Sequence, residues 1–403
     1  MTSDDVGVDV DDVRAAALAI HGQVVRTTAA PSRVLSSLTG SEVVLKYETQ
    51  QFTGSYKERG ALTRLLQLTD EERLRGVVAA SAGNHAQGVA HHATRLGIKS
   101  TIVMPLGTPF VKVARTQALG ATVELTGRNL DEAMVRALEI ATGGAVFVHP
   151  FDDPHVIAGQ GTVGLELVDD ALDLDALLVP VGGGGLLAGV ATAFRGCGQK
   201  TEIIGVQSQR YPGMWLALRD DSTAVPGGAT LAEGIAVSHP GLLTRQLARR
   251  VVDDVVLVTE ESLEDAVNAI IEVERIVVEG AGAAGVAALL ADPARYRGRR
   301  VGIILTGSNI DQRVLAEVIL RGLTRSGRTS TLRVLLDDSP GRLASLLTVV
   351  ADQRANLLDV THHRSSGETP AREVLVSLSV ETLDRAHLEQ LVAALTTAGA
   401  RLR

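Results

Sequence analysis

The chain has 403 residues, of which 45% are apolar and only 2% aromatic, and its formal net charge is −8. This length allows two or three domains with sizeable cores, built from Ala, Val, Leu and Ile as in parallel sheets covered by helices. An acidic chain without a run of Lys and Arg is not expected to bind nucleic acid.

The single cysteine, Cys197, excludes an internal disulfide and a cysteine-rich metal site, as is usual in a reducing compartment. The acidic N-terminal stretch MTSDDVGVDVDDVR is unlike a secretory signal peptide. No apolar run reaches the roughly 18 residues of a membrane span. We therefore expect a cytoplasmic protein without a membrane partner.

Short apolar strands alternate with helices from about residue 76 onward. The strands are GVVAA, STIVM, ATVEL and AVFV, and helices are predicted from Asn84, through VKVARTQAL and through LDEAMVRALEIA. This alternation predicts right-handed crossovers in a parallel sheet, which form a small domain over about 53–148.

A second series of the same kind follows. It comprises ALLVPV with a helix from Gly185, EIIGVQS, VVLVT with EESLEDAVNAIIEVER, and VGIILTG with a helix after Asp311. We expect a large domain formed by the remainder of residues 1–322, so that two stacked parallel-sheet α/β domains enclose a cleft.

The stretch RGLTRSGRTS near 321–330 is polar and aperiodic, and we interpret 323–330 as a linker. Residues 331–403 are too few for another sheet of the same kind. Their pattern predicts a small βαββαβ domain.

The stretch QFTGSYKERGA (51–61) contains Lys57, one of only five lysines among 39 basic residues. Lysine, unlike arginine, can lose its proton in a dry site and attack a carbonyl. Lys57 is therefore a candidate amine nucleophile, and the alternative is a lysine on a solvated helix start.

The stretch SAGNHAQGVA (81–90) follows a strand and opens a helix. Backbone N–H groups and the positive end of the helix dipole would then face a ligand above the strand, as suits a carboxylate or a phosphate. The alternative is an ordinary Ser/Asn helix cap.

The stretch VPVGGGGLLAG (179–189) places four consecutive glycines between a strand and a helix. Several N–H groups can curl around an anion there. Gly182 and Gly184 begin a G-x-G pattern, but Leu187 occupies the place of a third glycine and no Lys-Ser or Lys-Thr pair follows. A compact monophosphate is therefore favoured over a dinucleotide.

The stretch ILTGSN (304–309) places the Thr306 hydroxyl at the carboxyl end of a strand, where open α/β sheets bind ligands. The four features together are an amine nucleophile, a monophosphate cradle, a helix N-terminus for a carboxylate, and a hydroxyl. Pyridoxal phosphate carrying an amino acid uses all of them.

The order QFTGSYK, SAGNHAQG, GGGGLLAG, EGAGA (279–283) and TGSN resembles the serine/threonine dehydratase branch of the fold-type II pyridoxal-phosphate enzymes over about residues 10–322. This branch has the tryptophan synthase beta-like fold. Residues 331–403, with DDSPGRLASLL and NLLDVTHHR, resemble an ACT domain, a small amino-acid-sensing module. Within the branch, the chain is most similar to threonine ammonia-lyases with one ACT domain.

The resemblance implies the roles of the site residues. Lys57 would hold pyridoxal 5'-phosphate as a Schiff base and remove the α-proton of the substrate. Asn84 would bind the ring hydroxyl oxygen, and Thr306 would face the ring nitrogen. The cofactor's phosphate would be held by Gly182, Gly183, Gly184, Gly185 and Leu186.

The substrate carboxylate would be gripped by the loop that contains Ser81, Gly83, Asn84 and His85. The implied reaction is β-elimination, and a neutral hydroxyl facing the ring nitrogen suits that reaction. The expected product is a 2-oxo acid with ammonia, 2-oxobutyrate if the substrate is L-threonine.

Three residues depart from the family pattern. Tyr56 stands where Phe is common, which adds a hydroxyl. Ala82 stands where related serine racemases carry a second catalytic Ser, so racemisation is not expected. Gln207 follows the strand EIIGV where those racemases place divalent-cation carboxylates, so we expect no required metal.

Other titratable residues have plainer interpretations. His91 and His92 are interpreted as surface or packing residues of the helix from Asn84 rather than as ligands. Glu279, directly before GAGA, could approach the cofactor ring.

The resemblance leaves alternatives open. L-serine could be the preferred substrate, or the chain could be an amino-acid sensor with a vestigial lyase half. Isoleucine or valine is the expected effector at the DSPGR turn of the ACT domain. We expect a homo-oligomer, a dimer or a tetramer.

Overall fold

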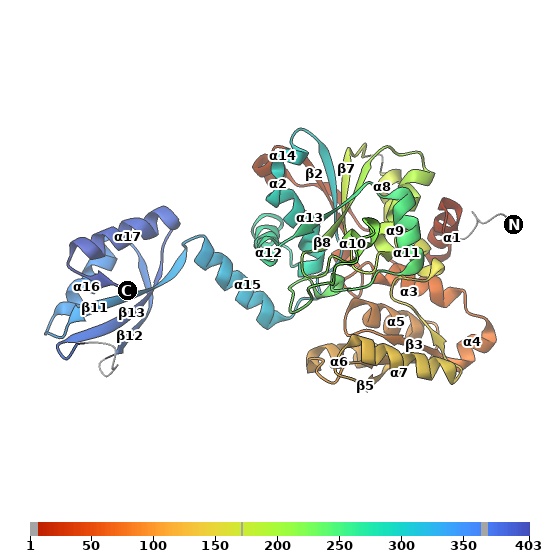
Figure 1. Cartoon of the computed structure of the whole chain (residues 1–403), viewed down its shortest axis with the longest axis horizontal. Helices are drawn as coiled ribbons and strands as arrows, with labels where there is room; N and C mark the ends of the chain where they lie inside the picture. The colour runs from red at the N-terminus through yellow and green to blue at the C-terminus, as the bar shows by residue number, and fades with distance from the viewer. Residues whose placement is uncertain (1–6, 171, 364–369) are drawn as a thin grey trace. The chain divides into compact units, whose positions relative to one another are not determined.

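The structure is a computed structural model that describes residues 7–170, 172–363 and 370–403. Residues 1–6 of the acidic N-terminal stretch, and Arg364 at the end of NLLDVTHHR, lie outside the described residues. The chain divides into two compact units, Met1–Ile310 and Asp311–Arg403 (Figure 1). None of the described helices is long and apolar enough to cross a membrane.

The smaller sheet of the first unit has four parallel strands in the order β5-β4-β3-β6. Their bounds are β3 (Val77–Ala80), β4 (Ser100–Met104), β5 (Thr122–Leu125) and β6 (Val146–Phe147). In β3, Val77 and Ala79 pack with α5, whereas Val78 and Ala80 pack with α7. Alternate residues of a strand point to opposite faces, so an all-apolar strand is buried on both sides. The first predicted series of strands is confirmed.

The larger sheet has six strands in the order β1-β2-β10-β7-β8-β9, and only the β1–β2 pair is antiparallel. Their bounds are β1 (Ala29–Pro31), β2 (Glu42–Tyr47), β7 (Ala176–Pro180), β8 (Glu202–Ser208), β9 (Asp254–Val258) and β10 (Arg300–Leu305). The second predicted series of strands is confirmed. The sequence analysis did not predict β1 or β2, because β1 is very short and β2 ends in the charged and polar residues Lys46 and Tyr47.

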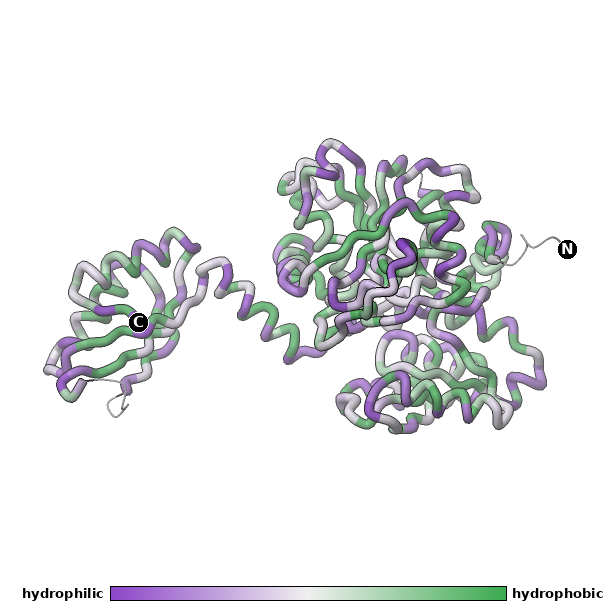
Figure 2. Tube along the Cα trace, viewed as in Figure 1, coloured by the Kyte–Doolittle hydropathy of each residue, from purple (hydrophilic) through white to green (hydrophobic). Residues whose placement is uncertain are grey.

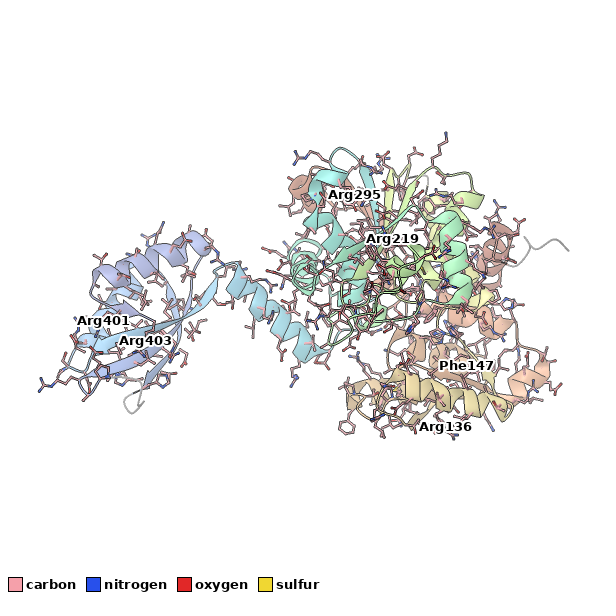
Figure 3. The ribbon with its side chains drawn as sticks, viewed as in Figure 1. Arg136, Phe147, Arg219, Arg295, Arg401 and Arg403 are labelled. Atoms are coloured by element: carbon pink, nitrogen blue, oxygen red, sulfur yellow. The ribbon has the colours of Figure 1, made fainter. Side chains whose placement is uncertain are left out.

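Helices connect and cover the strands of both sheets (Figure 1). Their bounds are α1 (Val10–Ile20), α2 (Arg33–Thr39), η1 (Glu48–Gln50), α3 (Lys57–Leu66), α4 (Asp70–Arg75), α5 (Asn84–Arg95), α6 (Phe110–Ala118), α7 (Leu130–Thr142), α8 (Pro154–Asp169), α9 (Gly185–Gly196), α10 (Gly213–Leu218), η2 (Glu233–Ile235), α11 (Leu242–Val251), α12 (Glu260–Glu274), α13 (Gly280–Ala291) and α14 (Pro293–Tyr296). Apolar residues concentrate along the strands (Figure 2). Charged side chains lie mainly outside; Arg136 on α7 pairs with Glu124 and Glu139 there (Figure 3).

The second unit confirms the predicted βαββαβ order and the ACT-like fold. It consists of α15 (Gln312–Arg325), β11 (Thr329–Asp337), α16 (Arg342–Asp352), β12 (Asn356–His363), β13 (Glu373–Glu381), α17 (Arg385–Thr397) and β14 (Arg401–Leu402). The sheet order is β12-β13-β11-β14, with antiparallel pairs throughout. One apolar core joins the sheet to α16 and α17.

The stretch 323–330, interpreted from the sequence as a linker, contains the end of α15 and the start of β11. Only residues 326–328 separate the two elements, and Gly327 adopts a positive φ of +74° in that turn. The helix continues further than the polar composition suggested. The domain boundaries at 322 and 331 stay predictions.

Candidate active site

Lys57 is the first residue of α3, directly after Tyr56. Its Nζ donates a hydrogen bond to the backbone oxygen of Pro150 at 2.8 Å. Among the described residues, no carboxylate forms an ion pair with Lys57. Desolvation lowers the pKa of Lys57 to about 8, although the charge of Glu279 acts in the opposite direction. An appreciable share of the side chain is therefore a neutral amine near neutral pH.

The SAGN loop forms the turn between β3 and α5, and the predicted helix start at Asn84 is confirmed. Gly83 is the N-cap residue, and no side chain caps the helix, so the alternative of an ordinary Ser/Asn cap is wrong. The Ser81 hydroxyl accepts a hydrogen bond from the Gly83 N–H at 3.2 Å. The first-turn N–H groups of α5 remain available for an anion.

His85 lies in the first turn of α5, but its ring is buried and Nε2 hydrogen-bonds the Val148 backbone oxygen at 2.9 Å. A carbonyl can only accept, so Nε2 carries the proton. Burial, with the charge of Lys57 as a smaller cause, lowers the pKa of His85 to about 3, and the ring is neutral. His85 can offer a backbone N–H to a substrate carboxylate, but not a ring charge.

Gly182, Gly183 and Gly184 lie between β7 and α9, Gly185 is the first residue of α9, and other segments of the chain pack closely against all four. A Cβ on Gly183 would come within 2.2 Å of the Phe151 ring, and one on Gly185 within 3.0 Å of the Phe151 backbone oxygen. Gly184 is the N-cap of α9 with φ +99°. Only glycine fits these positions without displacement.

The same loop has free donors. In the part of the chain that the structure describes, no backbone acceptor takes the N–H groups of Gly182, Gly183 or Gly184. The first turn of α9, which contains Leu186, begins at this point. Free N–H groups at the positive end of a helix form a cradle for a phosphate.

The turn after β10 joins the loop of Lys57 to the rest of the site. Thr306 is buried, and its backbone oxygen accepts from the Tyr56 N–H at 3.2 Å. The Ser308 N–H donates to the Gly54 oxygen at 2.9 Å, and the Glu279 N–H donates to the Gly307 oxygen at 3.0 Å. The turns after β3, β7 and β10 all lie at carboxyl ends of parallel strands.

The segment Pro150–Asp152 is a part of the site that the sequence analysis missed. Pro150 accepts from Lys57, and Phe151 packs against Gly183 and Gly185. Asp152 accepts from the N–H groups of Leu243 and Thr244 at 3.0 and 3.1 Å. The Thr244 hydroxyl in turn donates to the Gly183 oxygen at 2.6 Å. This segment therefore links the amine to the glycine loop.

His92 is buried and His91 is half-buried, and with Glu58 they offer ligand atoms within 4.8 Å of one another. Arg95 Nη1 lies 3.2 Å from His92 Nδ1, and a guanidinium can only donate. The ring proton therefore lies on Nε2, which faces Glu58 Oε2 at 3.5 Å. His91 stacks on Phe52 with the ring centroids 4.3 Å apart. This geometry favours the packing interpretation, and the absence of a required metal stays a prediction.

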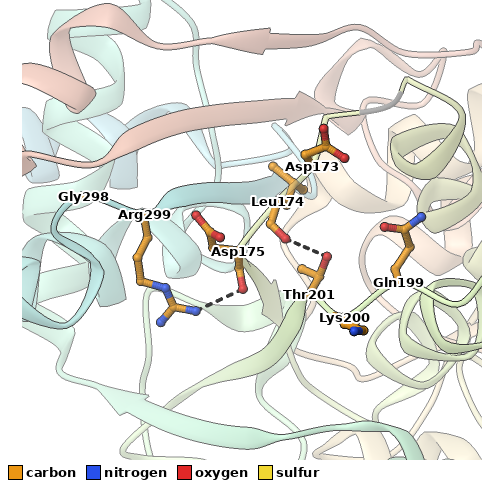
Figure 4. Close-up of a pocket in the computed structure, with 8 residues that line it drawn as sticks. All are labelled: Asp173, Leu174, Asp175, Gln199, Lys200, Thr201, Gly298 and Arg299. Atoms are coloured by element: carbon orange, nitrogen blue, oxygen red, sulfur yellow. Dashed lines mark hydrogen bonds between the residues drawn. The ribbon is translucent and has the colours of Figure 1, made fainter.

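A polar pocket lies at the opposite edge of the large sheet (Figure 4). Its lining residues precede β7, β8 and β10: Asp173, Leu174, Asp175, Gln199, Lys200, Thr201, Gly298 and Arg299. Arg299 donates to the Asp175 oxygen and to Glu202, and the Thr201 hydroxyl donates to the Leu174 oxygen. This pocket is not part of the Lys57 site.

Two stacked α/β sheets with a half-buried lysine amine, a glycine cradle and a helix start without a side-chain cap define a class of protein, the fold-type II enzymes that bind pyridoxal phosphate. Residues 20–307 match the family described as pyridoxal-phosphate dependent enzyme, and residues 330–397 match the ACT domain. The chain belongs to this family and carries a C-terminal ACT domain.

Three similar proteins cover most of the chain. L-threonine ammonia-lyase of Thermotoga maritima is 46% identical over 98% of this chain and 99% of its own length. L-threonine dehydratase catabolic TdcB of Escherichia coli (strain K12) is 43% identical over 76% of this chain and 94% of its own length. The solved structure of the processed form of threonine deaminase isoform 2 from Solanum lycopersicum has a TM-score of 0.72 and 36% identity, covering 77% of this chain and 94% of that chain.

Proposed function

We propose that this enzyme is an L-threonine ammonia-lyase, which eliminates the β-hydroxyl of L-threonine and yields 2-oxobutyrate and ammonia. The observation that carries the proposal is the Lys57 amine, which has a lowered pKa, bonds to the Pro150 oxygen and lies next to a glycine cradle. The similarity to L-threonine ammonia-lyase of Thermotoga maritima, which extends over nearly the whole chain, supports threonine as the substrate.

The residues of the site fit pyridoxal phosphate. The N–H groups of Gly182 to Gly184, which have no backbone acceptor among the described residues, and the start of α9 suit its phosphate, and the Lys57 amine suits its aldehyde. Pyridoxal phosphate, when bound, supplies an electron-withdrawing ring that stabilises negative charge at the substrate Cα. We assign the ring hydroxyl oxygen to Asn84 and the ring nitrogen to Thr306.

Lys57 would have two tasks. Its Nζ would hold the aldehyde carbon of the cofactor, and the same amine, when free, would accept the proton from the substrate Cα. The substrate carboxylate would be oriented by the Ser81 hydroxyl and by N–H groups of Gly83, Asn84 and His85. The Thr306 hydroxyl carries no formal charge, so it does not favour a protonated ring nitrogen, which suits elimination of the neighbouring hydroxyl.

The experiment is to supply the purified protein with pyridoxal phosphate, record its visible absorption, and measure 2-oxo acid formation from L-threonine and from L-serine. We expect a cofactor band and more efficient formation of 2-oxobutyrate than of pyruvate. The additional methyl of threonine contributes on the order of 1–3 kcal/mol in an apolar pocket. Equal or greater efficiency with L-serine would replace the threonine assignment by a serine ammonia-lyase. Absence of a cofactor band would favour the amino-acid sensor.

We further propose that isoleucine or valine regulates the enzyme through the ACT domain, at the turn where Gly341 precedes α16. An effector must bind the active and inactive states with different affinity to change activity. Threonine saturation curves with and without millimolar isoleucine or valine test this. Unchanged curves would leave the domain with a role in subunit association only.

The pathway, the assembly and the location are also proposals. 2-Oxobutyrate could supply isoleucine synthesis or be an end of threonine breakdown. A homo-oligomer, either a dimer or a tetramer, in the cytoplasm is expected. Light scattering of the purified protein measures the assembly, and a single-subunit mass would contradict it.

A further inference from the structure

Glu279 is the N-cap residue of α13, but its side chain does not cap that helix. Instead, its Oε1 accepts a hydrogen bond from Asn84 Nδ2 at 2.7 Å. The two residues are 195 positions apart in the sequence, so only the fold brings them together. The carboxylate of Glu279 therefore binds a side chain at the start of α5 instead of capping its own helix.

The amide of Asn84 has one possible orientation in this network. Asn309 Nδ2 donates to the Thr53 backbone oxygen at 2.7 Å and to Asn84 Oδ1 at 2.8 Å. The Asn84 atom next to this donor must be oxygen, and the atom next to the Glu279 carboxylate must be nitrogen. Nδ2 carries two hydrogens, and Glu279 takes one of them.

Two glycines lie beside the carboxylate, and Gly307 makes room for it. A Cβ on Gly307 would lie 2.5 Å from Glu279 Oε1 and 3.1 Å from Asn84 Nδ2. A Cβ on Gly234 would lie 3.4 Å from the same Oε1. A side chain at position 307 would therefore collide with the Asn84–Glu279 contact, whereas one at position 234 would touch it at an ordinary distance.

We propose that Glu279 is a positioning residue, which holds the Asn84 amide so that its second Nδ2 hydrogen is presented to the ring oxygen of bound pyridoxal phosphate. This inference rests on the role proposed above for Asn84 and deepens it. Glu279 acts through Asn84, and the fixed amide is ready before the cofactor arrives, which lowers the entropy lost on binding.

The charges around Glu279 make the contact sensitive to pH. Lys57 of α3, Lys112 of α6 and Glu233 of η2 face it, and Lys112 is paired with Glu233. Burial is the largest cause that raises the pKa of Glu279 to about 7, while the Asn84 hydrogen bond opposes the shift. Above that pH the carboxylate is charged, and hydrogen bonds to a charged acceptor are stronger. The hydrogen bond between Glu279 and Asn84 should therefore become stronger as the pH rises through about 7.

The test measures the dissociation constant of pyridoxal phosphate by equilibrium dialysis for the full-length protein and for Glu279→Ala, Asn84→Ala and the double variant. Glu279→Ala should weaken binding by roughly 10- to 100-fold in the wild-type background. It should have little further effect when Asn84 is already alanine, because the two residues act as one unit. Equal losses in both backgrounds, or no loss at all, would overturn the proposal.

A second variant guards against misfolding. Glu279→Gln keeps an acceptor for Asn84 but not the charge, so it should retain most of the affinity while losing the tightening between about pH 6 and 8. Unchanged pH dependence in this variant would also overturn the proposal. The matched control is Glu274→Gln, another half-buried carboxylate, which accepts from Tyr47 Oη at 2.9 Å; its affinity should equal that of the wild type.

The two proposals can fail separately. Wild-type protein that binds the cofactor but does not convert L-threonine contradicts the proposed activity and leaves the binding measurements interpretable. Wild-type turnover combined with unaltered cofactor affinity in Glu279→Ala contradicts only the positioning role.

Discussion

Lys57 and Arg59 lie two residues apart at the start of α3, in regions that differ in charge. Within the described part of the chain, the Lys57 Nζ bonds to the Pro150 oxygen and to no carboxylate, and desolvation lowers its pKa to about 8. Arg59 is fully buried and bonds to Glu48 at 2.8 Å and to Glu166 at 2.7 Å. Burial acts to lower its pKa, but the attraction of these two carboxylates outweighs burial and raises the pKa. Neighbouring residues on one helix thus have opposite protonation behaviour.

Residue type alone does not explain the difference. Lys46 is fully buried, unlike the half-buried Lys57, and it bonds to Glu166 at 2.6 Å and to the Thr27 oxygen at 2.7 Å. Two cations and two carboxylates form this cluster, so its formal charge is balanced. A buried charge is stable only with such partners. The two lysines thus differ in burial and in partners: Lys46 is fully buried and paired with a carboxylate, whereas Lys57 is half-buried and, among the described residues, forms no ion pair.

The largest effect is expected when the Lys57 amine is removed. Lys57→Ala should lower formation of 2-oxobutyrate by a factor on the order of 10⁴ or more, because one group both holds the cofactor and moves the proton. Lys57→Arg should be as inactive, since arginine keeps the charge but cannot lose its proton. Circular dichroism checks folding, and substantial turnover by either variant would contradict the assignment.

The second prediction concerns the charged region. Arg59→Met should lower the free energy of unfolding by about 3–5 kcal/mol, because it leaves buried carboxylates uncompensated. Urea unfolding followed by the fluorescence of Trp215, the single tryptophan, measures this. Arg14→Ala is the matched control, since that ion pair with Asp11 is exposed, and it should unfold as the wild type does. An unaltered midpoint for Arg59→Met would show that the cluster is not needed for stability.

The third prediction sharpens the description of the Lys57 region. Gly183→Ala places a Cβ within 2.2 Å of the Phe151 ring, next to the residue that accepts from Lys57. Overpacking of this kind costs about 1–3 kcal/mol, so cofactor affinity should fall by roughly 5- to 150-fold. Gly107→Ala is the control, because nothing lies within 4 Å of its Cβ. Equal cofactor affinities for the two variants would contradict the assignment of the glycine loop as the phosphate-binding site.

The smallest expected effect is a pH dependence. A lysine whose pKa is about 8 is mostly charged at pH 7 and mostly neutral at pH 9. The rate at which the cofactor-free protein takes up pyridoxal phosphate should therefore rise about tenfold between those values. Glu279, His85 and His149 are the titratable groups that interact with Lys57. Stopped-flow absorption measures the rate, and a flat profile would mean that the neutral amine is not limiting.

Much of the fold and of the site could be predicted from local sequence. The glycine run between β7 and α9, the helix start at Asn84 and the position of Thr306 after β10 are all where the patterns placed them. Each depends on residues close together in the chain: an apolar strand, a turn without side chains, and a helix period. Motif order then indicated the family.

Tertiary structure alone decided which partners these residues have. The Asn84–Glu279 contact joins residues 195 positions apart, and the Arg59–Glu166 contact joins residues 107 apart. The sequence places His85 in a loop that is predicted to bind the substrate carboxylate, but its ring is buried against the Val148 oxygen. A residue's own neighbours in sequence determine its backbone conformation, but burial and charge depend on distant segments. The lysine is visible in the sequence, whereas the packing of the sheets decides its partners: among the described residues, its Nζ bonds to the Pro150 oxygen and forms no ion pair.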